Sequence, residues 1–390
     1  MNNDRDLDIV IYGATGYTGR LVAEYLYQHY GINGDVRWAM AGRSMHKLEM
    51  VRDELGIDSA LPLLLADASD PVSLQDMAVK TKVVLTTVGP YQNYGSEVLA
   101  ACAAVGTDYV DLCGEPTWMH AMIAEHSAAA KASGARIVFS CGFDSVPFDL
   151  GVYLLQQLAT QEFGSPVSRV RGRVRSLVGT WSGGTLASAR ATMAAAGKDA
   201  ALINVLVNPF SLCEGFNGPA QPEGNKVLFE DSIGSWAAPF MMAVINTKNI
   251  HRSNFLLGHP YGKAFVYDEM IMTGSGDAGE AAAKAISKDN SMTTDTTAPG
   301  EGPTKEEREA GSYDLLFVGE TASGETLRVS VKGDKDPGYG STCGMIAESA
   351  ICLALHPEMA SGGIWTPAAA MGDVLINRLV THAGLSFEEE

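Results

Sequence analysis

The chain has 390 residues, of which 46% are hydrophobic and 19% are charged. This balance is typical of a globular protein, and the length fits two domains better than one. The 28 basic and 46 acidic residues give a formal net charge of −18, and the sequence contains no run rich in Lys and Arg. Nucleic acid and an anionic membrane surface are therefore disfavoured as partners.

The composition also bears on location and on metal sites. Acidic residues stand near the N-terminus where a secretory signal would carry positive charge, and no apolar run reaches the roughly 18 residues of a membrane span. We therefore expect a cytoplasmic protein. None of the six cysteines has a zinc-like spacing, so we expect reduced structural thiols and no metal site.

The first 150 residues alternate short apolar segments with helical patterns. Six segments are predicted as buried strands: 8–13, 35–42, 61–67, 82–91, 108–113 and 136–142. The segments between them are predicted as helices, with short turns on either side. This alternation is typical of an α/β fold with a doubly wound parallel sheet, the Rossmann architecture.

A different pattern follows residue 150. The segment 168–179 alternates Val with Arg or Ser, as expected for a strand with one wet face, and 312–321 with 325–334 is predicted as a hairpin. Residues 151–340 therefore form a second, α+β domain with an antiparallel sheet for substrate binding or dimerisation. Within it, 275–311 is interpreted as a polar, mobile surface excursion. Residues 341–390 are predicted as helices that pack back on the first domain.

The first predicted strand runs into a glycine-rich turn that opens a helix. Gly13, Gly16 and Gly19 would allow a tight turn, the approach of a phosphate to the backbone, and close packing of the helix on the sheet. The intervening residues Ala14, Thr15, Tyr17 and Thr18 would contribute backbone N–H groups at the positive end of the helix dipole. The turn therefore predicts a dinucleotide site.

The end of the second strand indicates which dinucleotide is bound. An NAD site commonly has an acidic residue there, whereas this chain has Gly42, Arg43 and Ser44, followed by Lys47. Arg43 can bind a 2′-phosphate through its fork and Lys47 as a point charge, so NADP(H) is the predicted cofactor. Asp67 and Ala68, after the third strand, are placed to reach the adenine, although Asp67 could equally cap the next helix.

Three later strands end on the same edge of the sheet, where the nicotinamide is expected. The fourth strand ends at Val88, Gly89, Pro90 and Tyr91, and the sixth ends beside Gly142 and Phe143. A proton donor near the nicotinamide would complete a reduction, and the candidates are Tyr91, Glu115 and Asp144. Each of the three could instead be a cap or a packed core residue. No hydrolase or metalloenzyme motif is present.

At these residues the sequence resembles a known family. The segments "DIVIYGATGYTGRLVAEYL", "AGRSMHKL", "VVLTTVGPYQNYG", "GTDYVDLCGEP" and "GARIVFSCGFDSVPFDLGVY" are similar to the saccharopine dehydrogenase-like oxidoreductases, and most of all to the trans-acting enoyl reductases of phthiocerol-type lipid biosynthesis. The resemblance implies an NADP-dependent oxidoreductase that reduces an enoyl, acyl or carbonyl-type small molecule, and family analogy implies a homodimer. Segment 275–311 is polar here but apolar in relatives, which argues against a membrane contact or a long lipid substrate.

The resemblance extends into the second domain and suggests a substrate side. Its candidates are Ser182, Gly183 and Thr185 at the start of a helix, with His251, Arg252 and Asn254 in "NIHRSN". Two other functions stay open. An amino-acid dehydrogenase acting on a secondary amine could use Arg171, Arg173 and Arg175 to bind substrate carboxylates, unless these residues form a solvated strand face. A regulator or scaffold could bind NADP without turnover.

Overall fold

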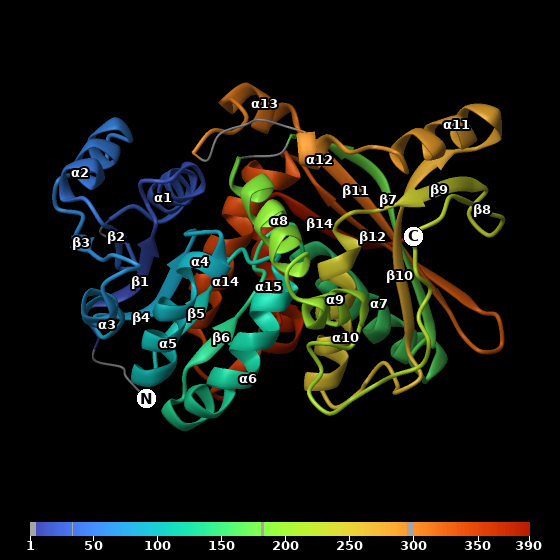
Figure 1. Ribbon diagram of the computed structural model, residues 1–390, viewed down its shortest axis with the longest axis horizontal. Coiled ribbons are helices and arrows are strands. Elements are labelled where there is room, and N and C mark those ends of the chain that lie inside the picture. Colours follow the sequence, from blue (N-terminus) through green and yellow to red (C-terminus); the bar gives the residue numbers. More distant parts are fainter. Residues whose placement is uncertain (1–4, 33, 181–182, 295–299) are drawn as a thin grey trace.

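The computed structural model describes residues 5–32, 34–180, 183–294 and 300–390. Two seven-stranded sheets form the framework, and Figure 1 shows them side by side, sheet A on the left and sheet B on the right. Sheet A is parallel throughout, with the order β13-β6-β5-β4-β1-β2-β3. Sheet B is mixed, with the order β14-β12-β11-β7-β10-β9-β8 and a single parallel pair, β7 with β10. The predicted α/β class with a second α+β domain is confirmed.

Sheet A carries its helices in the connections between strands. Its strands are β1 (Leu7–Tyr12), β2 (Trp38–Gly42), β3 (Leu63–Leu65), β4 (Thr81–Thr86), β5 (Asp108–Val110), β6 (Arg136–Val138) and β13 (Gly363–Trp365). Its helices are α1 (Tyr17–Tyr30), α2 (Met45–Glu54), α3 (Pro71–Ala78), α4 (Tyr91–Tyr94), α5 (Ser96–Val105), α6 (Pro116–Ser133) and α7 (Val146–Phe163). Residues of β1 are buried along its whole length, as expected of a central parallel strand.

Sheet A has one strand more than the sequence predicts. The seventh strand, β13, lies 225 residues after β6 in the chain yet pairs with it, Ile364 opposite Ile137. The expected domain boundary at residue 150 falls inside α7, which continues through this residue without a break. Local periodicity could not reveal either feature, since both depend on packing between distant segments.

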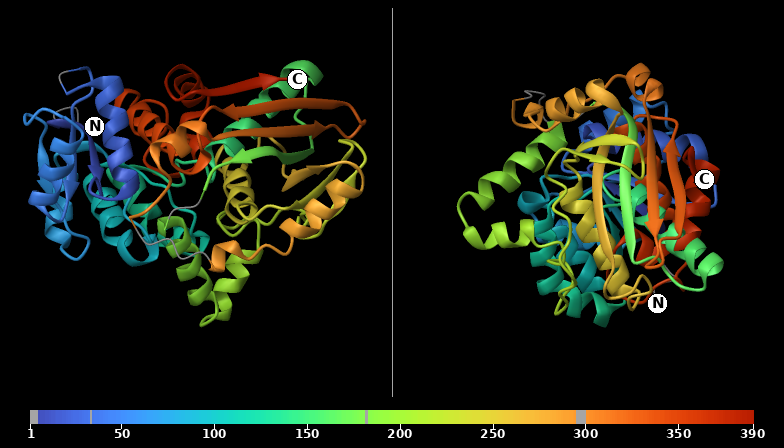
Figure 2. Two further views of the ribbon diagram at one scale, coloured as in Figure 1. Left: turned by 90° about the horizontal axis from the view of Figure 1, so that it is seen from above. Right: turned by 90° about the vertical axis from the view of Figure 1, so that its right-hand side faces the viewer.

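Sheet B and its helices make up the second domain. The strands are β7 (Arg169–Val178), β8 (Leu228–Glu230), β9 (Ser235–Pro239), β10 (Val266–Gly274), β11 (Ser312–Glu320), β12 (Thr326–Gly333) and β14 (Leu385–Glu389). The helices are α8 (Gly183–Ala196), α9 (Ala200–Val207), α10 (Ala243–Leu256), α11 (Gly276–Ile286), α12 (Ser291–Thr294) and α13 (Lys305–Ala310). Figure 2 shows α8 and α9 projecting from the body of the protein.

The predicted excursion 275–311 is more ordered than expected in its described part. It contains α11, which packs on β9 and β10, and α13, whose first turn is closed by a capping box between Thr304 and Glu307. These helices were not predicted, because their polar composition hides the helical spacing of apolar residues.

The C-terminal segment contacts both sheets. A π-helical turn, η1 (Pro337–Ser341), leads into α14 (Thr342–Leu355), which packs on α1 and on the strands β1, β4 and β5. A buried carboxylate fixes this contact: Glu348 accepts hydrogen bonds from the hydroxyls of Tyr25 and Tyr30, and Arg378 of α15 (Pro367–His382) pairs with it. Strand β14 then joins sheet B, so the last 50 residues tie the two sheets together.

Candidate functional site

The glycine turn after β1 has the close packing that a dinucleotide requires. Gly13 has φ +94°, and a Cβ there would lie 2.7 Å from Cγ2 of Val88. A Cβ on Gly19 would lie 2.2 Å from the carbonyl oxygen of Gly13, so α1 approaches the turn as closely as its backbone allows. A Cβ on Gly16 would lie 3.3 Å from the same oxygen, a tight contact. A side chain at position 19 would push α1 away from the turn, and one at position 13 would collide with the side chains of Thr87 and Val88.

The N-terminus of α1 is open to an anion. Gly16 is the N-cap and contributes no side-chain hydrogen bond, and the first turn has no acidic residue. Within the described residues, the backbone N–H groups of Tyr17 and Thr18 have no acceptor. Free N–H groups at a helix N-terminus are the arrangement that binds phosphate. The residues present therefore fit the pyrophosphate of a dinucleotide.

The segment after β2 presents two basic side chains and contains no acidic residue that could pair with them. Ser44 caps α2 by accepting the N–H of Lys47, while the side chains of Arg43 and Lys47 are exposed. Neither side chain has a hydrogen bond or ion pair within the described residues. Gly42 lies beside Thr15 of the glycine-rich turn, since a Cβ on Gly42 would be in ordinary contact with Cγ2 of Thr15, at 3.9 Å.

Asp67 is not the cap of the next helix, because Asp70 accepts the N–H groups of Val72 and Ser73 at the start of α3. The carboxylate of Asp67 instead accepts the N–H and hydroxyl of Ser69, and these bonds, helped by the charge of Arg43, hold the pKa of Asp67 below its ordinary value. The Arg43 contribution shows that Asp67 and Arg43 share this corner of the sheet, next to Ala68.

Two candidate proton donors, Tyr91 and Glu115, form hydrogen bonds within the protein at the ends of β4 and β5. Glu115 accepts the N–H of Tyr91 at 2.8 Å and that of Gln92 at 2.9 Å, and so caps α4. The hydroxyl of Tyr91 is buried, where it accepts the N–H of Leu112 at 3.0 Å. Desolvation raises the pKa of Tyr91 well above its ordinary value. The Tyr91 side chain therefore packs beneath the edge of sheet A, and Val88, Gly89 and Pro90 form the turn that precedes it.

Asp144 is different from these two residues. It is half-buried after β6, and its carboxylate has no hydrogen-bond or ion-pair partner within the described residues. It lies beside the end of β5, since a Cβ on Gly114 would be 3.5 Å from its Oδ2. Desolvation alone raises the pKa of Asp144 to about 6.

The loop that carries Asp144 is held from both sides. The N–H of Phe143 donates to Oγ1 of Thr342 at 3.0 Å, and the Phe143 ring packs in the core against Tyr313. Gly142 is needed for packing, because a Cβ there would be 2.7 Å from Leu112. Gly142 and Phe143 thus position the loop, with the Phe143 side chain turned to the core.

The start of α8 lies close to the dinucleotide turn. Thr185 is 3.2 Å from the hydroxyl of Tyr339, and the Tyr339 ring meets the Tyr17 ring edge-on, with centroids 5.0 Å apart. The N–H of Gly183 donates to the carbonyl of Glu301. Ser182 lies outside the described residues. The structure thus brings Gly183 and Thr185 next to the predicted cofactor site.

The other substrate candidates do not line an open site. Arg252 and His251 on α10 are buried, and Arg252 donates to the carbonyls of Leu212 and Ile364. Burial lowers the pKa of His251 to about 3, so it is neutral. Asn254 closes the following loop by accepting the N–H of Tyr261 and donating to the carbonyl of Gly262. These three residues stabilise the second domain from its interior. Their spacing in the sequence does not reveal this burial.

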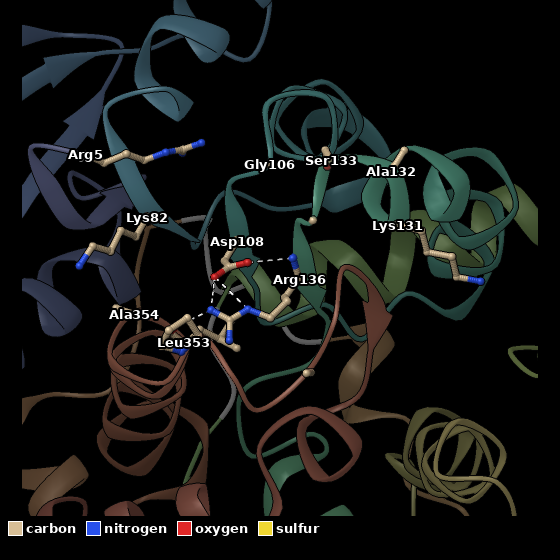
Figure 3. A pocket seen from close by; sticks show the side chains of 13 residues that line it. Arg5, Lys82, Gly106, Asp108, Lys131, Ala132, Ser133, Arg136, Leu353 and Ala354 are labelled. Atoms are coloured by element: carbon tan, nitrogen blue, oxygen red, sulfur yellow. Dashed lines mark hydrogen bonds and ion pairs between the residues drawn. The ribbon is translucent and has the colours of Figure 1, made fainter. Parts of the chain in front are cut away.

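A hollow of about 340 Å³ lies at the opposite edge of sheet A, where the strands begin (Figure 3). It is lined by Arg5, Lys82, Lys131 and Arg136. Arg5 donates to carbonyls at the ends of α3 and α5, and Arg136 donates to the end of α14 and to Asp108. These guanidinium groups stabilise helix C-termini by donating to their last carbonyl groups. Helix capping therefore accounts for the arginines in this hollow.

Comparisons with known proteins show the family of this chain. The model of the saccharopine dehydrogenase NADP-binding domain matches residues 9–138. A protein of Mycobacterium tuberculosis that provisionally carries the name trans-acting enoyl reductase is 40% identical over 98% of this chain and 97% of its own length. This chain belongs to the saccharopine dehydrogenase-like family, in the branch of the trans-acting enoyl reductases.

Two further proteins extend the comparison. The trans-acting enoyl reductase of Mycobacterium ulcerans is 36% identical, and the alignment covers 96% of both chains. The apo saccharopine dehydrogenase of Saccharomyces cerevisiae shares the fold, with a TM-score of 0.55 at 12% identity over 98% of this chain and 99% of its own. The NADP-binding domain of the family confirms NADP(H) as the cofactor.

The described residues also bear on membranes and metals. No helix among them is long and apolar enough to cross a membrane. No cluster of three or more His, Cys, Asp or Glu residues in that part of the chain could hold a metal ion.

Proposed function

We propose that this chain is an NADPH-dependent reductase that adds a hydride and a proton across a double bond of an enoyl, acyl or carbonyl-type small molecule. The observation that carries the proposal is that Asp144 has no hydrogen-bond or ion-pair partner within the described residues and lies at the edge of sheet A where a Rossmann fold places the nicotinamide of its cofactor. The names of the relatives support the reaction class.

Different residues bind the cofactor, donate the proton and contact the substrate. When bound, NADPH supplies the hydride. The free N–H groups at α1 hold the pyrophosphate, and Arg43 binds the 2′-phosphate. Asp144 gives its proton to the substrate atom next to the one that accepts the hydride, and its raised pKa of about 6 keeps a protonated fraction near neutral pH. The first turn of α8, with Gly183 and Thr185, borders the substrate.

An amino-acid dehydrogenase is disfavoured by one observation. The arginines that would bind substrate carboxylates are already paired within sheet B: Arg171 with Glu230 and Glu320, Arg173 with Glu230 and Asp268, and Arg175 with Asp314 and Glu390. Strand β7 therefore uses them as cross-strand ion pairs.

Turnover of a substrate panel tests the proposal. We expect purified protein to oxidise NADPH in the presence of an enoyl thioester or a ketone, measured by the loss of NADPH absorbance. Turnover of an imine alone would instead favour the amino-acid dehydrogenase. Asp144→Asn should remove turnover and leave NADPH binding intact. Tight NADPH binding without turnover of any class would instead favour the regulator or scaffold. The homodimer stays a prediction, which sedimentation velocity tests directly.

A further inference from the structure

A segment of the second domain, residues 300–311, sits on the first residue of α1. The Tyr17 hydroxyl donates to the carbonyl of Pro303 and accepts Nη1 of Arg308 at 3.0 Å. A Cβ on Gly302 would lie 2.6 Å from the Tyr17 ring. The segment is therefore fitted to an aromatic side chain that belongs to the dinucleotide turn itself.

Arg308 uses only part of its guanidinium group for hydrogen bonds within the described residues. Its Nη1 donates to the Tyr17 hydroxyl and to the carbonyl of Pro303, and the guanidinium carbon is 5.9 Å from the centre of the Tyr17 ring. Within the described residues no carboxylate lies at ion-pair distance, and neither Nη2 nor Nε donates a hydrogen bond. Part of the fork is thus unused.

The neighbouring acids are occupied elsewhere. On α13, Glu307 belongs to the capping box with Thr304, and Glu309 pairs with Lys305. Asp336 interacts electrostatically with Arg308, but its carboxylate accepts the N–H groups of Tyr339 and Gly340. A positive charge is therefore held beside the side chain of Tyr17, the first residue of α1, and two backbone N–H groups in the first turn of that helix have no acceptor within the described residues.

We propose that Arg308 is a cofactor-binding residue supplied by the second domain, and that its guanidinium contacts the pyrophosphate of NADP(H) bound at the N-terminus of α1. An anion bound at the helix end would accept hydrogen bonds from these N–H groups and from the unused part of the fork. Arg43 has a separate task, since it lies at the end of β2, where a 2′-phosphate is expected. Arg308 would thus bind NADPH and NADH alike, and segment 300–311 would close over either one.

Equilibrium binding without substrate tests this assignment. In Arg308→Gln we expect the Kd of NADPH and the Kd of NADH to rise by the same factor, about 10- to 100-fold, as for the loss of a charge-assisted hydrogen bond to phosphate. Lys305→Gln removes the same charge from the same short helix and should leave both constants unchanged. Arg308→Lys should restore only part of the affinity, because an ammonium lacks the fork.

Two further measurements guard against a purely structural effect. Tyr17→Phe keeps the ring that packs on Gly302 but loses the hydroxyl, so both Kd values should rise by a smaller factor. NADPH should slow proteolysis of segment 300–311 in the wild type and not in Arg308→Gln. Unchanged constants in Arg308→Gln, or a loss confined to NADPH, would overturn the assignment. The inference rests on the proposed cofactor use, but binding without turnover would overturn only the reductase proposal.

Discussion

The carboxylate of Glu115 accepts the backbone N–H of Tyr91 at 2.8 Å, and this contact joins two residues that the sequence presents as candidate proton donors. Glu115 comes from the start of α6, and Tyr91 begins α4, so the bond fixes the turn after β4 to the end of β5. Both residues are buried. Their shared task is to hold the edge of sheet A in shape.

We therefore expect Glu115→Gln to lower the free energy of unfolding by about 1–3 kcal/mol, the cost of turning an amide group toward a buried N–H. Urea denaturation measures this. Glu97→Gln, an exposed change in the first turn of α5, is the matched control and should change little. If Glu115→Gln kept wild-type stability but lost turnover, Glu115 would belong to the chemistry.

Asp144→Asn should lower kcat by about 100-fold or more, the usual contribution of a general acid, without changing the Kd of NADPH. In the wild type, kcat/KM should fall as the pH rises above about 6, because the ionised carboxylate holds no proton to give. A pH profile of the variant with the same fall would show that another group is the donor.

Arg43→Ala should weaken NADPH binding by about 10- to 100-fold and NADH binding little, because only NADPH carries the 2′-phosphate. Isothermal titration of both cofactors gives the ratio. Lys47→Ala removes a point charge one turn along α2 and should have a smaller effect in the same direction. Equal weakening of both cofactors by Arg43→Ala would contradict the assignment.

Gly19→Ala should destabilise the protein by about 1–3 kcal/mol or more and weaken NADPH binding, because its Cβ would be 2.2 Å from the Gly13 carbonyl oxygen. Thermal unfolding and NADPH titration provide the measurements. Gly197→Ala is the control, since a Cβ there meets nothing closer than 3.5 Å. Wild-type stability in Gly19→Ala would mean that α1 can move away from the turn at little cost.

Asp149 predicts how stability depends on pH. Desolvation raises the pKa of this carboxyl to about 7, although Ser253 and the N–H of Ala368 donate to it. Between about pH 4 and 7, the folded chain therefore keeps a proton on Asp149 that the unfolded chain has already released. The free energy of unfolding falls as the pH rises through this window. The total loss is about 1.4 kcal/mol per unit of difference between the folded and unfolded pKa.

Asp149→Asn cannot titrate, and its amide can donate to the Ser253 hydroxyl while its oxygen accepts the Ala368 N–H. Chemical denaturation at a series of pH values should show a shallower fall for the variant. Parallel curves for the two proteins would mean that Asp149 does not contribute to the pH dependence.

The sequence by itself determined the features that depend on neighbours along the chain. Six of the seven strands of sheet A follow from short apolar segments, and Gly13, Gly16 and Gly19 mark the turn after β1 because backbone geometry there is a local matter. The absence of an acid after β2, with Arg43 in its place, gave NADP(H), which the family's NADP-binding domain confirms.

Only the tertiary structure decided what each polar side chain does. Glu115 and Asp144 look alike in the sequence, yet Glu115 is taken up by two N–H groups and Asp144 has no partner among the described residues. His251 and Arg252 become interior residues, while Arg308 comes to Tyr17 from 291 positions away. Strand β13 likewise pairs with β6, although it lies more than 220 residues after β6 in the chain. Burial and pairing of this kind arise from contacts between distant segments, which periodicity and spacing along the chain do not encode.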